Sequence, residues 1–169
     1  TPSPLWNRTF LANKNLFDVN LFRSQEADFH FRMLSFSPKY VAHADFLYKV
    51  RRGHESIEST SADLKKQLSV LHYFENAFNI VHQKTFEEKS ILQKYLIFRI
   101  LGQIYIVVSR EKNLIARLKY YHFQKTIFKY GLYLGIGSFI RIQLGFSILL
   151  LFNKGYSLII LKKFDLRKK

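Results

Sequence analysis

Hydrophobic positions recur with a helical period in one part of this 169-residue chain. Over about 61–82, apolar side chains such as Leu64 and Leu68 follow one another every three or four residues, which places them on one face of a helix. Ser61 is the expected N-cap, and Asp63 lies in the first turn, where its charge favours the helix dipole. The stretch therefore predicts an amphipathic helix.

A two-residue period appears in the last third of the chain. From Ile140 to Ile148, apolar residues alternate with Arg, Gln, Gly and Ser, which is the pattern of a strand with one buried face. The apolar stretch 126–134 precedes it and ends in a Gly-rich turn at 135–138, so we expect a hairpin. A second turn at 153–155 returns the chain as a further strand over 156–161.

Shorter patterns suggest four more elements. Residues 95–100 and 103–108 are rich in Ile, Val, Tyr and Phe and predict two β segments around Gly102. Residues 109–121 can form a short helix with a basic polar side. Alternation over 29–33 suggests a short strand within an otherwise irregular, aromatic-rich N-terminal extension.

Together these elements predict an α+β fold, in which a small antiparallel sheet packs with helices. A hydrophobic content of 48% is enough for a core. We expect three parts: an extension with one amphipathic helix (1–86), a reduced hairpin domain (87–112) and a basic α+β domain (113–169).

Residues 131–152 also allow a different interpretation. The stretch is mostly apolar, with Lys129 before it and Lys154 after it, as in a transmembrane helix. Against this, a central Arg141 costs about 2.5–3.5 kcal/mol on insertion scales, and the two-residue period favours strands. A membrane helix remains the alternative.

Positive charge is concentrated in the second half of the chain. The net charge is +15, and residues 83–169 contain 17 Lys or Arg against 4 Asp or Glu, whereas 1–82 contain 10 against 8. No acidic residue occurs over 112–164. Such an imbalance favours a polyanion, whose counterions are released on binding. The residues expected to contact the phosphates of such a polyanion are Lys112, Arg117, Lys119, Lys125, Lys129, Arg141, Lys154, Lys162, Lys163, Arg167, Lys168 and Lys169.

Aromatic residues beside these cations offer a second type of contact. Tyr-Tyr-His-Phe at 120–123 lies between Lys119 and Lys125. These rings either stack on exposed bases or belong to the hydrophobic core.

Several kinds of catalytic chemistry have no counterpart in the sequence. The chain has no Cys, which excludes disulfides, thiolate catalysis and Cys-based zinc sites. No Gly-rich phosphate loop occurs, acidic residues are few, and His72 and His82 lack further metal ligands at suitable spacing. We therefore expect no enzyme activity, no metal, no cofactor and no small-molecule substrate.

The stretch from Asn113 to Ser147 resembles the second domain of the large-subunit ribosomal protein L-six family. Leu-Gly-Phe-Ser at 144–147 looks like the end of the family's return strand, and Asn-Leu-Ile at 113–115 is similar to its Asn-Met-Ile. Ile-Gly-Ser at 136–138 falls where the family has its hairpin turn. The family's His after Leu-Gly-Phe-Ser is Ile148 here, and its basic C-terminal helix has no counterpart.

The resemblance implies a structural protein of a large ribosomal subunit. Its partners would be ribosomal RNA and neighbouring ribosomal proteins, with a separate chain as one way to complete the C-terminal domain. Abundant Phe and Tyr with few Gly are typical of an AT-rich, organellar genome. We therefore expect a divergent protein of the mitochondrial ribosome, located in the matrix. The alternative is a small accessory subunit of a membrane respiratory complex or ATP synthase, anchored by 131–152.

Overall fold

The computed structural model of the chain describes residues 5–39, 41 and 63–154. Every regular element in this part of the chain is helical, so the predicted α+β fold with an antiparallel sheet is wrong. The elements are α1 (Arg8–Leu11), α2 (Gln25–Leu34), α3 (Leu64–Gln83), α4 (Lys89–Ser109), α5 (Leu114–Leu118), the 3-10 turn η1 (Lys119–His122), α6 (Phe123–Gly131), the 3-10 turn η2 (Leu132–Leu134) and α7 (Ile136–Phe152).

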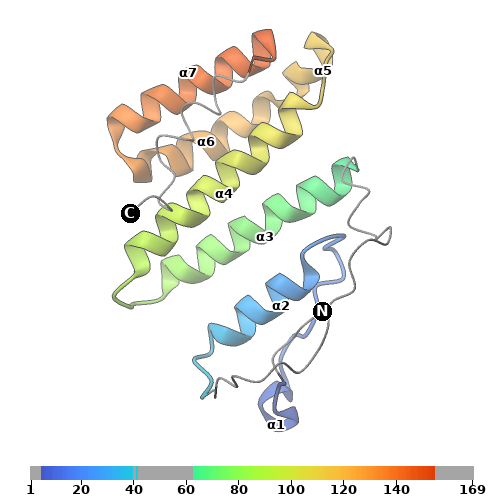
Figure 1. Cartoon of the computed structure of the whole chain (residues 1–169), viewed down its shortest axis with the longest axis vertical. Coiled ribbons are helices and arrows are strands. Elements are labelled where there is room, and N and C mark those ends of the chain that lie inside the picture. Colours follow the sequence, from blue (N-terminus) through green and yellow to red (C-terminus); the bar gives the residue numbers. More distant parts are fainter. Residues whose placement is uncertain (1–4, 40, 42–62, 155–169) are drawn as a thin grey trace.

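The helices lie in successive layers (Figure 1). Helices α3 and α4 run side by side in opposite directions and make the most extensive contact between two elements. Helix α2 packs on α3 from one side, while α6 and α7 contact α4 from the other. Helix α7 therefore forms an outer layer of the molecule.

The amphipathic helix predicted over 61–82 is confirmed as α3. It begins at Leu64, and the N-cap is Asp63, whose side chain accepts a hydrogen bond from the backbone N–H of Lys65 at 2.8 Å. Ser61, the predicted cap, lies outside the described residues. Phe78, further along the helix, is among the most deeply buried side chains.

The two β segments predicted around Gly102 are instead one continuous helix, α4. Its buried side chains, including Ile97, Ile100 and Ile104, are almost completely enclosed. Burial of these β-branched residues outweighs their modest helix propensity. Gly102 lies within the helix rather than at a turn, and a Cβ at this position would meet nothing within 4 Å.

The hairpin predicted in the last third is also wrong. Residues 126–134 belong to α6 and η2, and the alternating segment 140–148 lies within α7. The predicted turn exists at Gly135, where φ is +87°, but it joins η2 to α7. Asn153 ends α7 in the left-handed conformation, as the second predicted turn requires, and the return strand at 156–161 lies outside the described residues.

Two smaller expectations are corrected as well. The strand suggested for 29–33 is part of α2, in which Phe29 and Met33 are buried one turn apart. In the same helix, Arg32 forms an ion pair with Asp28, and their side-chain nitrogen and oxygen atoms are 2.7 Å apart. The short helix expected over 109–121 is limited to α5, which Asn113 caps, followed by η1.

One hydrophobic cluster joins α3, α4, α6 and α7. Phe78 of α3 meets Tyr130 of α6 edge to face, with ring centroids 4.9 Å apart. Between α4 and α3, the buried Gln103 side chain donates to the backbone carbonyl of Gln67 at 3.0 Å. The cluster therefore crosses the boundaries at 86/87 and 112/113 that the sequence suggested.

Residues 131–152 do not form one helix. Helix α6 ends at Gly131, the chain turns at Gly135, and α7 has 17 residues. Among the described helices, α4 is the one long and apolar enough to cross a membrane, and 44% of its apolar window is buried inside the protein. A core helix meets the same criterion of length and composition.

Candidate nucleic-acid interface

The twelve basic residues predicted to bind RNA fall into three groups. The exposed ones are Lys112, Lys119, Lys125, Lys129, Arg141 and Lys154. Lys162, Lys163, Arg167, Lys168 and Lys169 lie outside the described residues. Arg117 is buried, with 4% of its surface exposed.

Arg117 uses its guanidinium within the protein. Its Nε donates to the carbonyl of Leu150 at 2.9 Å and its Nη2 to that of Leu151 at 3.2 Å, while Nη1 donates to the carbonyls of Glu111 and Lys112. These bonds fasten the loop before α5 to the C-terminal end of α7. Arg117 therefore holds the fold together at this place, and its burial leaves little of the guanidinium accessible to a phosphate.

An open groove lies between α6 and α7. Its volume is about 400 Å³, and it is lined by Tyr121, Gln124, Lys125, Phe128, Phe139 and Gln143. Phe128 and Phe139 meet edge to face across it, with ring centroids 5.2 Å apart. Tyr121 and Phe128 remain 65% and 54% exposed, so their ring surfaces are available to a ligand.

The lining of this α6–α7 groove matches the chemistry of a nucleotide. Exposed aromatic rings can stack on bases, and this contact tolerates any base because every base has a π face. The amides of Gln124 and Gln143 can donate to or accept from base edges. Lys125 supplies a positive charge for a phosphate beside them.

The aromatic segment 120–123 is divided between core and surface. Phe123 is buried in the hydrophobic cluster, and Tyr120 stacks on it with the rings nearly parallel at 6.0 Å. Tyr121 lines the α6–α7 groove. His122 is exposed and its Nδ1 lies 2.8 Å from the carbonyl oxygen of Lys119. Among these four residues, Tyr121 and His122 thus keep exposed rings that could stack on a base.

Lys129 lies on another side of α6 from the groove. Its Nζ is 4.9 Å from the centre of the Tyr130 ring, and its charge lowers the pKa of Glu75 on α3. Desolvation outweighs this effect and leaves the pKa of Glu75 raised. Lys129 is therefore partly engaged within the protein, whereas Lys125 faces the groove.

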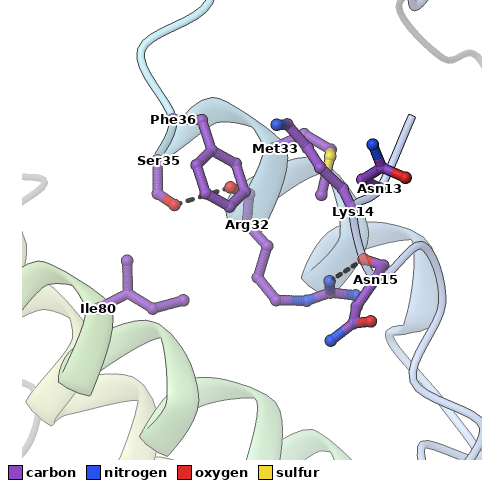
Figure 2. Close-up of a pocket in the computed structure, with 8 residues that line it drawn as sticks. All are labelled: Asn13, Lys14, Asn15, Arg32, Met33, Ser35, Phe36 and Ile80. Atoms are coloured by element: carbon purple, nitrogen blue, oxygen red, sulfur yellow. Dashed lines mark hydrogen bonds between the residues drawn. The ribbon is translucent and has the colours of Figure 1, made fainter. Parts of the chain in front are cut away.

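A second cavity, of about 420 Å³, lies among α2, the segment that precedes it and Ile80 of α3 (Figure 2). Figure 2 shows the Arg32 side chain extended to the backbone carbonyl of Asn15, to which it donates. Lys14 lies over the rings of Phe10 and Phe36, at 4.8 and 4.5 Å. Both cations of this cavity are thus occupied by local contacts, and the α6–α7 groove is the better candidate site.

No significant match to the chain is found among protein-family models, curated proteins or solved structures. The residues that carry the L-six resemblance adopt another conformation here: Leu-Gly-Phe-Ser at 144–147 is inside α7, and Asn113 is the N-cap of α5. Within the described residues, no group of three His, Asp or Glu could hold a metal ion.

Most of the groove has no clear signal in the sequence. Charge points to Lys125, and the aromatic neighbours point to Tyr121. Phe128 and Gln124 complete a pattern of positions 121, 124, 125 and 128, which lie on one face of a helix. This spacing indicates a common surface only if the segment is helical, whereas the sequence predicts a strand from 126 onwards.

Proposed function

We propose that the protein is an RNA-binding structural component of the mitochondrial large ribosomal subunit, which holds ribosomal RNA in the α6–α7 groove. The observation that supports this most directly is the meeting of exposed rings, amides and Lys125 in one open groove. Neighbouring ribosomal proteins are the further partners, and the mitochondrial matrix is the location.

Charge supports a polyanionic ligand beyond the groove itself. Lys125 lines the groove, and Lys119 on η1 and Arg141 on α7 are also exposed. No carboxylate occurs over 112–164 to neutralise them. A solvated charged surface usually carries both signs, so this excess favours phosphate contacts.

The shape of the groove favours unpaired nucleotides over a duplex. Bases in a helix are stacked on one another, and side chains do not enter the narrow major groove of A-form RNA. A loop or bulge can place a base against Tyr121 or Phe128. The assignment to a mitochondrial particle depends on the composition typical of an AT-rich genome, because the L-six resemblance implied a different fold.

Binding of the full chain to a fluorescent single-stranded RNA oligonucleotide tests the proposal. We expect the affinity to fall steeply as salt rises, and Lys125→Gln to reduce the slope of that dependence by about one. Tyr121→Ala with Phe128→Ala removes two stacking surfaces and should weaken binding by about tenfold or more.

Phe86→Ala is the matched control, because Phe86 is also an exposed ring but lies between α3 and α4. It should bind RNA like the unchanged chain. Equal affinity of the groove variants and this control, or binding that ignores salt, would exclude the α6–α7 groove as an RNA site.

The alternative function is that of a membrane-anchored accessory subunit of a respiratory complex or ATP synthase. Residues 131–152 are interrupted at Gly135, so α4 is the described helix whose length and composition would suit a span. Carbonate extraction of native membranes separates the two functions. A subunit with a spanning helix stays in the pellet, whereas a ribosomal protein is released.

A further inference from the structure

Helix α7 is apolar on both of its sides. One side is buried in the protein through Ile142, Phe146 and Leu149. The other carries Ile136, Ile140 and Leu144, each four residues from the next, with 74%, 51% and 59% of their surfaces exposed. We call these three residues, together with Leu151 and Phe152 at the end of the helix, the outer face of α7.

An outer face of this composition is unusual for a helix in contact with water. Such a helix normally presents polar residues to solvent, as α3 does with His72, Asn79 and His82. Within α7, Arg141 is the one charged side chain. The outer face of α7 therefore favours an apolar partner that covers the whole length of the helix.

Positive charges surround the outer face. Arg141 is exposed three residues before Leu144, on the same side of the helix, and the exposed Lys154 follows its C-terminal end. Lys112 is close to that end as well, because the Arg117 guanidinium bonds both its carbonyl and that of Leu151. An apolar surface with cations at its middle and end complements the boundary between acyl chains and anionic headgroups.

The packing of α7, together with its short length, favours a surface arrangement over a spanning one. Its 17 residues extend about 25 Å, which is shorter than the roughly 30 Å hydrocarbon core of a bilayer. Its inner side is occupied by contacts with α4, α5 and α6. Only the outer face is available, so the helix can lie in the plane of the interface.

We infer that the outer face of α7 docks on the surface of an anionic phospholipid bilayer, with the helix parallel to the membrane. The aliphatic side chains enter the region between headgroups and acyl chains, while Arg141 and Lys154 reach the phosphates with their long stems. This surface borders the α6–α7 groove, because Phe139 and Gln143 of the groove directly precede Ile140 and Leu144 in α7. Both proposals use Arg141, but the inference holds whether or not the groove binds RNA.

Flotation of the RNA-free full chain with vesicles tests the inference. The chain should float with vesicles of phosphatidylcholine mixed with phosphatidylglycerol, and much less with phosphatidylcholine alone. The double variant Ile140→Ser with Leu144→Ser should reduce vesicle binding about tenfold or more, because it removes two exposed aliphatic side chains that would enter the bilayer. Ile91→Ser is the control, since Ile91 is 63% exposed on α4, and it should float normally.

A fluorescent position on the outer face gives a second measurement that does not depend on the serine variants. Trp6 is the one tryptophan of the chain, so Leu144→Trp in a Trp6→Phe background reports on this face alone. Its emission should shift to the blue with mixed vesicles, and brominated lipids should quench it most strongly at shallow depth.

Three results would overturn the inference. The first is flotation of the chain with phosphatidylcholine vesicles that equals its flotation with mixed vesicles, or flotation of the double serine variant that equals that of the unchanged chain. The second is a dimer in sedimentation that the same variant dissociates, because a second copy would then cover the outer face. The third is loss of RNA binding by this variant while flotation stays unchanged.

Discussion

Arg117 of α5 donates a hydrogen bond from its Nε to the backbone carbonyl of Leu150 in α7, at 2.9 Å. The two residues lie 33 positions apart in the chain, and the bond is buried. The carbonyls in the last turn of a helix have no partner within the helix itself. A cation at this end also complements the negative pole of the helix dipole.

Replacing Arg117 with Met should therefore destabilise the fold. The variant leaves the Leu150 carbonyl and its neighbours without donors, and we expect a loss of about 2–4 kcal/mol in the free energy of unfolding. Arg117→Lys should recover only part of it, because an ammonium cannot reproduce the planar fork. Urea unfolding monitored by circular dichroism measures both.

Lys119→Met controls for the loss of one positive charge, because Lys119 is exposed two residues further along. It should change stability by no more than about 0.5 kcal/mol. If Arg117→Met were as stable as this control, the contact with α7 would contribute nothing to folding.

Gly135 and Gly137 should respond to alanine in opposite directions. Gly135 has φ +87° and ψ 156°, a conformation that is essentially restricted to glycine, so Gly135→Ala should cost about 1–3 kcal/mol. Gly137 is in the first turn of α7, and a Cβ added there would meet nothing within 4 Å, so Gly137→Ala should gain about 0.4–1 kcal/mol. Thermal unfolding of the two variants gives the comparison.

If both alanine variants changed the stability in the same direction, the turn between η2 and α7 would differ from the one described. In that case the position of α7 against α6, and with it the α6–α7 groove, would also need revision. The glycine pair thus tests the local geometry on which the proposed RNA site depends.

Helix α3 is predictable from the sequence and α7 is not, for one physical reason. In α3 one side faces water, so apolar residues recur with the helical period. In α7 both sides are apolar, and the helical period disappears from the sequence. The alternation over 140–148 then distributes apolar residues to both sides: Ile142 and Phe146 are buried, whereas Ile140 and Leu144 are exposed.

The length of the segments is the sequence feature that favours helices at α4 and α7. Strands usually have about four to eight residues, whereas the mostly apolar segments that form α4 and α7 extend over 21 and 17 residues without a proline. Gly102 suggests a turn, although a single glycine within a helix costs only about 1 kcal/mol. Burial against α3 offsets a penalty of this size.

The same limit applies to the candidate site. The charge pattern indicates Lys125 as a phosphate contact, but it indicates Arg117 equally, and Arg117 is buried. Phe139 and Gln143 reach the groove from α7, and their position depends on how α7 packs on α6. Such a contact between distant segments has no local pattern in the sequence.

Glu75 should make the stability of the protein depend on pH. This carboxyl is half-buried on α3, and desolvation raises its pKa above the ordinary value of 4.5, although His72 and Lys129 act in the opposite direction. At a pH well below that ordinary value, the carboxyl is neutral in both the folded and the unfolded chain, so it carries no penalty for burying a charge. As the pH rises, the unfolded chain releases this proton first, so stability falls until the pH passes the raised pKa.

Glu75→Gln removes this dependence. We expect the variant to gain stability relative to the unchanged chain as the pH rises through the ordinary value of 4.5 to the raised pKa, with no further gain above it. Urea unfolding at a series of pH values measures the difference, and Glu87→Gln at an exposed position controls for the change in net charge. A constant difference between the Glu75 variant and the unchanged chain across this range would show that burial does not hold the carboxyl in its neutral form.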